Sequence, residues 1–540
     1  MSQQVASLSV HQYGSRVIEC VLKHCTEQQK RPVLEQLHGN VSKLLEKNRT
    51  DNLELADLGK HVVEFAQDPR GSKFIEQKLG RANPTETAQL VDEVRGHVLT
   101  LALHKSGHHV IRKALETVDK TSQIEIINEL SAQVLLLSLH EYGNLVIRCV
   151  LEHCTEQQQK RHVLEQLHGN VLSLVTDKYG SLVIEHVLEH GLPEDREPIV
   201  RSLHENVLFL VMDKYGCFVI EHVLEHGLPE DRERIVRSLQ GDIMKYAQDK
   251  FGCFVILKCL IGGTADQKKA LFDNVCVGGP KTLQNARQLM ADEFGSHVIQ
   301  KFFEYGTDDQ KAQLVDALRG HVLELAQQMY GCHVIQAALK SVDKASQIEI
   351  INEITAQVIP LSLDKYGSRV IECVLEHCAE QEKRHVLKQL LDNVPTLVTD
   401  NYGSFVISHV IEHGLPEDRE RIVRSLQWGI LKNIHHKGIC DVINKCLIFG
   451  TTEQKNALID QVCADNGSGK PPLLQMMKQK FAKDVVQKML NVADSARRQK
   501  MMFVINNAPL KNTGIRAAES LAKKAGGTVA DKKRKKPNNG

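Results

Sequence analysis

The chain has 540 residues, of which 42% are hydrophobic and 25% are charged, and its formal net charge at pH 7 is +1. It has no run of 18 apolar residues and no apolar leader behind its polar start, which excludes a membrane span and predicts a soluble intracellular protein. The charge is uneven, because residues 511–540 carry nine Lys or Arg against two acids and leave residues 1–510 with a net charge of −6.

A phrase of the form Tyr-Gly-x-x-Val-Ile recurs along almost the whole chain, usually every 36 or 37 residues. Residues 177–197 and 213–233 differ only in two pairs, Ser181/Cys217 and Leu182/Phe218. A fixed period of this size predicts a solenoid, in which each repeat buries its apolar side against its neighbours. We count thirteen repeats, with degenerate copies near Ile439 and Ala482 and the glycine of the phrase at Gly14, Gly71, Gly107, Gly143, Gly180, Gly216, Gly252, Gly295, Gly331, Gly367 and Gly403.

The periodicity inside each repeat predicts helices and therefore an all-α fold. In the copy at Gly180, one side of a helix turning about 100° per residue is apolar and consists of Val183, Ile184, Val187 and Leu188. The opposite arc holds Ser181, Leu182 and Glu185. Gly191 is placed to end this helix, and Pro193 begins a second helix, whose apolar stripe is Ile199, Val200 and Leu203. In other copies the second helix begins with a Thr-x-x-Gln capping box, at Thr26, Thr155, Thr264 and Thr307.

Signals for catalytic or metal chemistry are weak. The 14 cysteines recur in step with the repeat and include no Cys-x-x-Cys, which indicates packing. Histidines four residues apart can bind zinc, but repeated packing or hydrogen bonding between repeats is the preferred interpretation of His186/His190, His222/His226 and His409/His413. No Ser/His/Asp, Cys/His or paired-carboxylate arrangement stands out from the repeats. We therefore predict no metal, no cofactor and no enzymatic activity.

The recurring phrase resembles the Pumilio (PUF) family of RNA-binding repeats, and the resemblance covers about Val5 to Val504. Residues 44–49 and 67–76 are similar to the opening of a Pumilio homology domain, and residues 480–490 are similar to its last repeat. Two 43-residue spacings, with Gly278-Gly279-Pro280 and Gly467-Ser468-Gly469 inserted, resemble the loop before that last repeat. The resemblance implies a right-handed, armadillo-like α-solenoid.

The number of repeats departs from the family, whose typical member has eight. Thirteen repeats, with a last-repeat-like insertion in mid-chain, resemble a partial tandem duplication fused in register. We therefore expect an extra PUF-like repeat at residues 1–43, a first block of PUF repeats at 44–290, a second block at 291–510 and a basic, disordered tail at 511–540.

In the family, each repeat presents three side chains of one helix to one RNA base. The resemblance places the two that meet the base edge at the first and fifth positions after the glycine (the edge positions) and the one that stacks on the base at the second (the stacking position). At Gly180 these are Ser181, Glu185 and Leu182, the arc found from helical geometry. The alternative interpretation is an exposed helix face that drifts freely while core residues are held by packing.

The edge residues sort by the base that they suit, since a carboxylate with a neighbouring hydroxyl matches the donors of guanine, and glutamine with a small partner matches adenine. The predicted guanine readers are Ser15/Glu19, Ser72/Glu76, Ser181/Glu185, Cys217/Glu221 and Ser368/Glu372. The predicted adenine readers are Ser296/Gln300 and Cys332/Gln336. Edge pairs without an assigned base are His108/Arg112, Asn144/Arg148, Cys253/Leu257, Ser404/Ser408 and Cys440/Asn444. The stacking candidates are Arg16, Lys73, His109, Leu145, Leu182, Phe218, Phe254, His297, His333, Arg369 and Phe405.

The order of these pairs predicts a target. If RNA runs antiparallel to the repeats as in the family, the stretch from Gly367 back to Gly180 reads 5′-GAANGG-3′. Asp441 and Asp484 occupy the stacking positions of the last two repeats, where an acid offers no aromatic face and repels phosphate. The Asn/Gln and Ser/Glu pairs with which typical members read the 5′ UGU of their target are absent at Ser404/Ser408, Cys440/Asn444 and Lys483/Gln487, so a UGUA-type target is not expected.

The resemblance implies a monomeric cytoplasmic protein that binds single-stranded RNA, in particular mRNA 3′-UTRs, on its concave face with one base per competent repeat. It also implies lowered translation or mRNA stability through partners such as deadenylase or translational-repressor proteins. The basic run Lys532–Lys536 leaves open a nuclear or nucleolar RNA or ribosome-assembly factor. The acidic average of residues 1–510 leaves open a protein-binding helical scaffold.

Overall fold

The computed structural model describes Leu55, Leu58 and residues 61–154, 156–276, 280–433, 435–464 and 471–506. In these ranges the regular structure is helical and no strand occurs. No helix of the described ranges has the length and apolar character needed to cross a membrane. The predicted N-terminal repeat at 1–43, the inserted glycines at 278–279 and 467–469, and the basic tail lie outside the described residues.

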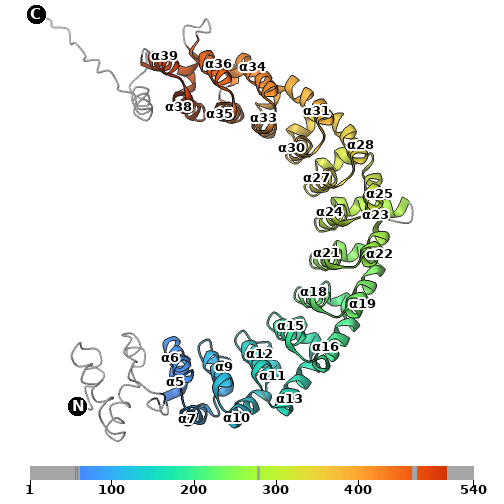
Figure 1. Cartoon of the computed structure of the whole chain (residues 1–540), viewed down its shortest axis with the longest axis vertical. Coiled ribbons are helices and arrows are strands. Elements are labelled where there is room, and N and C mark those ends of the chain that lie inside the picture. The colour runs from blue at the N-terminus through green and yellow to red at the C-terminus, as the bar shows by residue number, and fades with distance from the viewer. Residues whose placement is uncertain are drawn as a thin grey trace, which may run out of the picture. The chain divides into compact units, whose positions relative to one another are not determined.

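The chain divides into two compact units, Met1–Gln267 and Lys268–Gly540. Within each unit, helices follow one another in a repeating order of three (Figure 1), which confirms the predicted all-α solenoid. The boundary expected between residues 290 and 291 stays a prediction.

Most repeats begin with a short helix, and the next two helices lie on the concave and the convex side of their unit (Figure 1). In the repeat of Lys437–Phe449, no separate short helix occurs among the described residues, and the long helix Pro416–Asn433 comes directly before it. The short helices are α5 (Val62–Gln67), α8 (Val98–Ala102), α11 (Val134–Ser138), α14 (Val171–Val175), α17 (Val207–Leu210), α20 (Ile243–Ala247), α26 (Val322–Ala326), α29 (Val358–Leu363), α32 (Val394–Leu397) and α37 (Pro472–Met476), with the longer α23 (Pro280–Ala291) in the same place and the 3₁₀ turn η4 (Gln240–Asp242) before α20.

The concave-side helices, called inner helices below, are α6 (Pro69–Leu79), α9 (Gly107–Thr117), α12 (Gly143–His153), α15 (Gly180–His190), α18 (Gly216–His226), α21 (Gly252–Gly262), α24 (Gly295–Tyr305), α27 (Gly331–Ser341), α30 (Gly367–His377), α33 (Asn401–His413), α35 (Lys437–Phe449) and α38 (Ala482–Val492). The convex-side helices, called outer helices, are α7 (Pro84–Val94), α10 (Lys120–Ser131), α13 (Gln157–His168), α16 (Pro193–Glu205), α19 (Pro229–Leu239), α22 (Ala265–Cys276), α25 (Asp308–Leu318), α28 (Lys344–Thr355), α31 (Glu380–Asp392), α34 (Pro416–Asn433), α36 (Thr452–Cys463) and α39 (Ser495–Asn506).

An aspartate and a glycine determine where the inner helix begins. In the α15 repeat, Oδ1 of Asp177 accepts hydrogen bonds from the backbone N–H groups of Tyr179 (2.8 Å) and Gly180 (2.9 Å), which caps the first turn. A Cβ atom on Gly180 would lie 2.5 Å from the carbonyl oxygen of Leu174 in α14. The inner helix therefore packs directly on the backbone of the short helix, and only glycine leaves room for that contact.

The core of the repeat follows the predicted apolar side. Val183 and Ile184 are fully buried, Val187 and Leu188 nearly so, and the outer helix α16 adds Ile199 and Leu203, whereas Val200 is only half-buried. Gly191 caps the C-terminus of α15, and α16 begins at Pro193, as the sequence predicts. These interfaces repeat along each unit, since neighbouring inner helices such as α9 and α12 pack side by side.

The capping boxes are confirmed where the structure describes both residues. The side chain of Thr307 accepts from the Gln310 N–H (3.3 Å), and Oε1 of Gln310 accepts from the Thr307 N–H (3.0 Å). The same two bonds join Thr264 and Gln267, while Thr26 and Thr155 lie outside the described residues.

The same local geometry occurs once in the described part of each of the two units. Gly96 and Gly320 both have φ of 77°, a backbone conformation that favours glycine. Their N–H groups donate to Glu129 at 2.8 Å and to Glu353 at 2.7 Å. The residues before them, Arg95 and Arg319, make equivalent ion pairs with Glu125 and Glu349.

Candidate nucleic-acid interface

The stacking positions form an exposed row on the inner helices. Phe218, Phe254 and Phe405 are 55%, 51% and 56% exposed, and Leu182 is 38% exposed. Leu145 is half-buried, and the remaining described stacking candidates are exposed, namely Lys73, His109, His297, His333 and Arg369. Half of the surface of these apolar side chains is not covered by any described residue, so the row is accessible to flat ligands.

The first edge positions are buried, and the prediction that they share the exposed arc is wrong. Ser181 is only 4% exposed, and its hydroxyl donates to the carbonyl oxygen of Lys178 (3.4 Å). The first turn of the inner helix packs closely on the short helix through the glycine, and this contact covers the adjacent side chain. Other first edge residues are equally buried, and each of these donates from its hydroxyl or thiol to the carbonyl oxygen three residues before it: Ser72, Cys217, Cys253, Ser296, Cys332, Ser368 and Ser404.

This arrangement limits what the first edge position can do. Because its hydrogen is held by the helix backbone, a serine there presents only oxygen lone pairs toward the concave side. A ligand group that approaches Ser181 would therefore have to donate a hydrogen bond. The base-reading role itself stays a prediction.

The fifth positions are half-buried and carry the polar groups within reach of a ligand. Burial raises the pKa of the carboxyl groups of Glu185, Glu221 and Glu372. Oε1 of Glu221 is buried without a hydrogen-bond partner in the described structure. A carboxylate in this state gains from any donor that reaches it, and the paired N–H donors of guanine would do so.

Glu76 departs from the arrangement that its pairing with Ser72 predicts. Its side chain is half-buried on α6, and Oε1 lies 3.7 Å from Nδ1 of His109, the stacking candidate of the next repeat. The two groups form an ion pair when the histidine is protonated, because neighbouring inner helices bring the fifth position of one repeat beside the stacking position of the next. A guanine at this repeat would compete with the imidazole for the carboxylate, and the role of Glu76 as a reader stays a prediction.

The two predicted adenine readers hold their amide groups against their own helices. Nε2 of Gln300 donates to the carbonyl oxygen of Ser296 (3.1 Å), and Nε2 of Gln336 donates to that of Cys332 (3.2 Å). Each amide keeps a second N–H and a carbonyl oxygen for a ligand, which is the donor and acceptor pair that adenine requires.

The repeats of α9 and α12 differ, because their first edge residues are large and bond to the backbone of the preceding turn, while Oδ1 of Asn144 is buried without a hydrogen-bond partner among the described residues. Nδ1 of His108 lies 3.1 Å from the His104 carbonyl oxygen, and its ring stacks on Tyr142 at 5.1 Å. The side-chain amide of Asn144 donates to two backbone carbonyl oxygens of the preceding turn. Because these side chains already bond to the backbone of their own repeat, neither repeat fits a pairing for one base.

The fifth positions of the same two repeats are half-buried arginines. Nε of Arg112 is buried without a hydrogen-bond partner among the described residues. Burial and the nearby charge of Arg112 lower the pKa of Arg148. Two guanidinium groups on adjacent inner helices offer donors only, so this part of the row suits acceptor groups of a ligand.

The stacking positions of the last two repeats, on α35 and α38, carry acids, unlike those of the other described repeats, and their fifth positions carry amides. Asp484 is exposed and Asp441 half-buried at their stacking positions. Oδ1 of Asn444 and Oε1 of Gln487 are buried without hydrogen-bond partners among the described residues. The predicted residues Ser15, Arg16 and Glu19 lie outside the described residues.

A row of lysines was missed by reasoning from helical faces. These residues come two positions before the glycine, and each Nζ lies over the ring of the next residue: Lys178 over Tyr179 (4.8 Å), Lys214 over Tyr215 (4.9 Å), Lys250 over Phe251 (5.5 Å) and Lys365 over Tyr366 (4.9 Å). All four lysines are exposed at the start of an inner helix. The sequence pattern Lys-Tyr-Gly or Lys-Phe-Gly could have revealed these lysines, since a charge that recurs at one position of the repeat occupies the same place in each repeat.

The two rings of each histidine pair contact each other edge-on or tilted within one inner helix. Their ring centroids lie 4.7 Å apart in His186/His190, 4.9 Å apart in His222/His226 and 4.6 Å apart in His409/His413. Burial lowers the pKa of His186, His222 and His409, which favours their neutral form.

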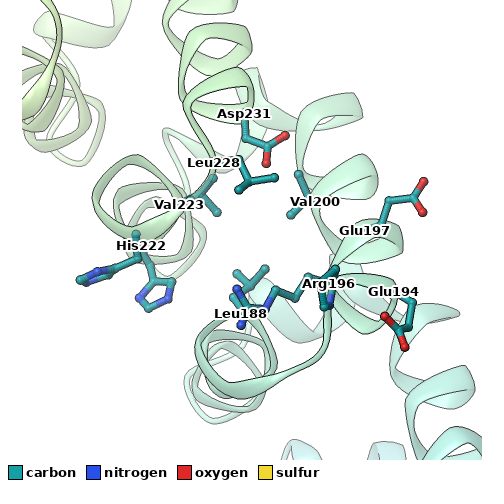
Figure 2. Close-up of a pocket in the computed structure, with 12 residues that line it drawn as sticks. Leu188, Glu194, Arg196, Glu197, Val200, His222, Val223, Leu228 and Asp231 are labelled. Carbon is teal, nitrogen blue, oxygen red and sulfur yellow. The ribbon is translucent and has the colours of Figure 1, made fainter.

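A groove of about 450 Å³ lies in the first unit between the repeats of α15–α16 and α18–α19 (Figure 2). Figure 2 shows the apolar side chains of Leu188, Val200, Val223 and Leu228 around it. Leu228 is 67% exposed. The rim carries the acids Glu194, Glu197 and Asp231, whereas Arg196 is held by the carbonyl oxygens of Gly191 and Glu189.

Repeats of three helices, most with an exposed side chain at the stacking position and a half-buried one at the fifth position, define a PUF-type α-solenoid. The model of the Pumilio-family RNA binding repeat matches thirteen segments, at residues 4–38, 61–95, 97–131, 133–168, 170–204, 206–239, 242–276, 285–319, 321–355, 357–391, 393–426, 440–463 and 473–505. The chain belongs to the Pumilio family of repeat proteins.

Curated relatives match over short stretches. The chain is 52% identical over 56 residues to Pumilio homolog 2 of Xenopus laevis and 48% identical over 56 residues to maternal protein pumilio of Drosophila melanogaster. These alignments cover 10% of this chain and 5% and 4% of the two relatives, so the chain spans about one twentieth of their length. It is 36% identical over 64 residues to the mRNA-binding protein PUF3 of Saccharomyces cerevisiae, covering 12% of this chain and 7% of that protein.

Solved structures are similar over a longer range. The Puf3 RNA binding domain bound to a Cox17 RNA 3′ UTR recognition sequence has a TM-score of 0.52 and 25% identity, covering 60% of this chain and 96% of that one. The Puf4 RNA binding domain, at 20% identity and a TM-score of 0.52, covers 57% of this chain and 97% of its own, and shows the fold alone.

Proposed function

We propose that this protein binds single-stranded RNA sequence-specifically along its inner helices, with one base per competent repeat. The observation that carries the proposal is the constant register on α15, α18, α24, α27 and α30, where an exposed stacking residue stands beside a half-buried carboxylate or amide. Family membership and the RNA bound to the similar Puf3 domain support it. Stacking contributes about 1–3 kcal/mol per base, so several such repeats suffice for tight binding despite modest net charge.

The proposed target is purine-rich. The glutamines of α24 and α27 and the carboxylate of α30 would read 5′-GAA, and the carboxylates of α18 and α15 would read GG-3′, with an unassigned base at α21. Ser181 and Ser368 add oxygen lone pairs one turn before the carboxylates of Glu185 and Glu372, which suits the two donors of guanine.

Selection from a random single-stranded RNA library with the full chain tests this function. Enrichment of a purine-rich motif that contains GAANGG in one register is the expected outcome. Enrichment of a UGUA-type motif would support sequence-specific RNA binding but contradict the assignment of the edge residues. Absence of any enriched motif at moderate salt would contradict sequence-specific binding.

We further propose that the RNA is the 3′-UTR of cytoplasmic mRNAs and that binding lowers translation or stability through partners such as deadenylases. This extension is supported by two similar proteins, the mRNA-binding protein PUF3 and the Puf3 domain bound to a 3′ UTR recognition sequence. Deleting Lys532–Lys536 and following the protein in cells tests the location. A protein that is cytoplasmic with and without the run agrees with the proposal, whereas loss of a nuclear pool would favour the ribosome-assembly alternative.

A protein-binding role is a second candidate, favoured by the groove of Figure 2. Three acids on an apolar groove suit a basic peptide with one or two apolar anchors. Peptide selection on the full chain should enrich such peptides, and Leu228→Glu should abolish their binding while Leu192→Glu, in the equivalent loop of the preceding repeat, should not. Enrichment that is insensitive to Leu228→Glu would argue against this groove.

A further inference from the structure

A cluster of three potential metal ligands lies between two neighbouring inner helices of the first unit. Glu116 comes from the last turn of α9, and Cys149 and His153 come from one face of α12, where residues four apart are neighbours. One ligand atom of each side chain lies within 4.8 Å of the other two. In the part of the chain that the structure describes, this is the one group of three His, Cys, Asp or Glu with such convergence.

The surroundings of the cluster bury the thiol of Cys149 and leave the other two side chains partly exposed, with Nε2 of His153 lying 3.8 Å from Oε2 of Glu152. Cys149 is 4% exposed, and its thiol makes a long contact of 3.6 Å to the carbonyl oxygen of Arg112. Nε2 of Gln123 donates to the carbonyl oxygen of His153 (3.1 Å), which fixes the end of α12. Glu116 pairs with Lys113, three residues before it, at 2.9 Å. A partly exposed pair of this kind is weak and easily released.

We propose that Glu116, Cys149 and His153 bind a zinc ion. Thiolate, imidazole and carboxylate are the ligand types that Zn²⁺ takes, at bond lengths of about 2.0–2.3 Å, with water able to complete a tetrahedron. Rotation of the partly exposed Glu116 and His153 side chains would bring the carboxylate and the imidazole to the buried thiol. The Cys149 thiol gives up its proton to solvent as the metal–sulfur bond forms, so that thiolate charge and carboxylate charge offset the cation.

The second unit contains a natural control. Cys373 and His377 occupy in α30 the places of Cys149 and His153 in α12, and Cys373 makes the same contact, to the carbonyl oxygen of Gln336 at 3.8 Å. Lys340 stands where Glu116 stands in α9. A lysine ammonium repels a cation and offers no lone pair, so the second site should remain without metal.

Co²⁺ titration of the full reduced chain tests the proposal, since a cobalt–thiolate bond produces a near-ultraviolet charge-transfer band. We expect a band that saturates at one Co²⁺ per chain and disappears on addition of Zn²⁺. Cys149→Ser should abolish it, and the matched variant Cys373→Ser should leave it unchanged. No band in the wild type, or equal loss in both variants, would overturn the proposal.

A substitution of Glu116 tests the site without disturbing the fold, because this side chain lies at the surface. Glu116→Lys, which copies the second unit, should weaken Zn²⁺ binding at least about tenfold in competition with a chromogenic chelator. Far-ultraviolet circular dichroism should be the same as in the wild type. The converse variant Lys340→Glu should add a second equivalent of bound Co²⁺. Unchanged affinity in Glu116→Lys would exclude the carboxylate as a ligand and with it the site.

Discussion

At the scale of single residues, the fifth edge position is where base identity should be decided. Glu185→Gln replaces two acceptor oxygens by one acceptor and one donor pair, so preference at one base should move from guanine toward adenine with little change in overall affinity. Glu189→Gln, an exposed glutamate on the same helix away from the edge positions, is the control. Parallel RNA selections with the two variants measure the shift, and an unchanged motif in Glu185→Gln would remove this residue from the readers.

The stacking position should control affinity rather than base identity. Phe218→Ala removes an exposed ring, so RNA binding should weaken by about 1–3 kcal/mol while the unfolding midpoint stays the same. Phe209 in α17 is 56% exposed and supplies the control, since Phe209→Ala removes an equally exposed ring outside the inner helices. Titration of both variants with the same RNA compares them. Equal weakening in both would show that the ring at 218 acts as general apolar surface.

At the scale of elements, the contact between the inner and short helices carries a large share of repeat stability. Gly180→Ala places a methyl group 2.5 Å from the Leu174 carbonyl oxygen and should destabilise the protein by roughly 1–3 kcal/mol. Gly262 in α21 has no atom within 4 Å of such a methyl group, so Gly262→Ala should be neutral or stabilising by up to about 1 kcal/mol. Urea denaturation of the two variants measures the difference, and a neutral Gly180→Ala would mean that the two helices separate easily.

At the same scale, the elements show what periodicity can and cannot predict. The apolar side of α15, its end at Gly191 and the start of α16 at Pro193 follow directly from local sequence. The short helix α14 was not predicted, because five residues are too few for a helical period. The burial of Ser181 was not predicted either, since it depends on how close a second element approaches. Glu116 and Cys149 meet only because two successive repeats pack together, a relation that no single repeat contains.

At the scale of the whole molecule, the lysines before the glycines should set the salt dependence of RNA binding. Replacing Lys178, Lys214, Lys250 and Lys365 by alanine should reduce the slope of log affinity against log salt by up to about 0.7 for each phosphate that these lysines neutralise. The base motif should stay the same. Alanine at four exposed lysines of outer helices, Lys269, Lys344, Lys388 and Lys500, is the control. A slope that is equal in both quadruple variants would place the phosphates elsewhere.

The glycine contact also bears on how such a protein evolves. Because α15 is held through backbone atoms and through residues on its apolar side, the exposed stacking residue can change without loss of the fold. Residues 177–197 and 213–233 show this, since the two copies share every residue of the apolar side and differ only at the buried first edge position and the exposed stacking position. Each duplication thus supplies a further helix whose exposed stacking residue can change while the core that holds the helix stays the same.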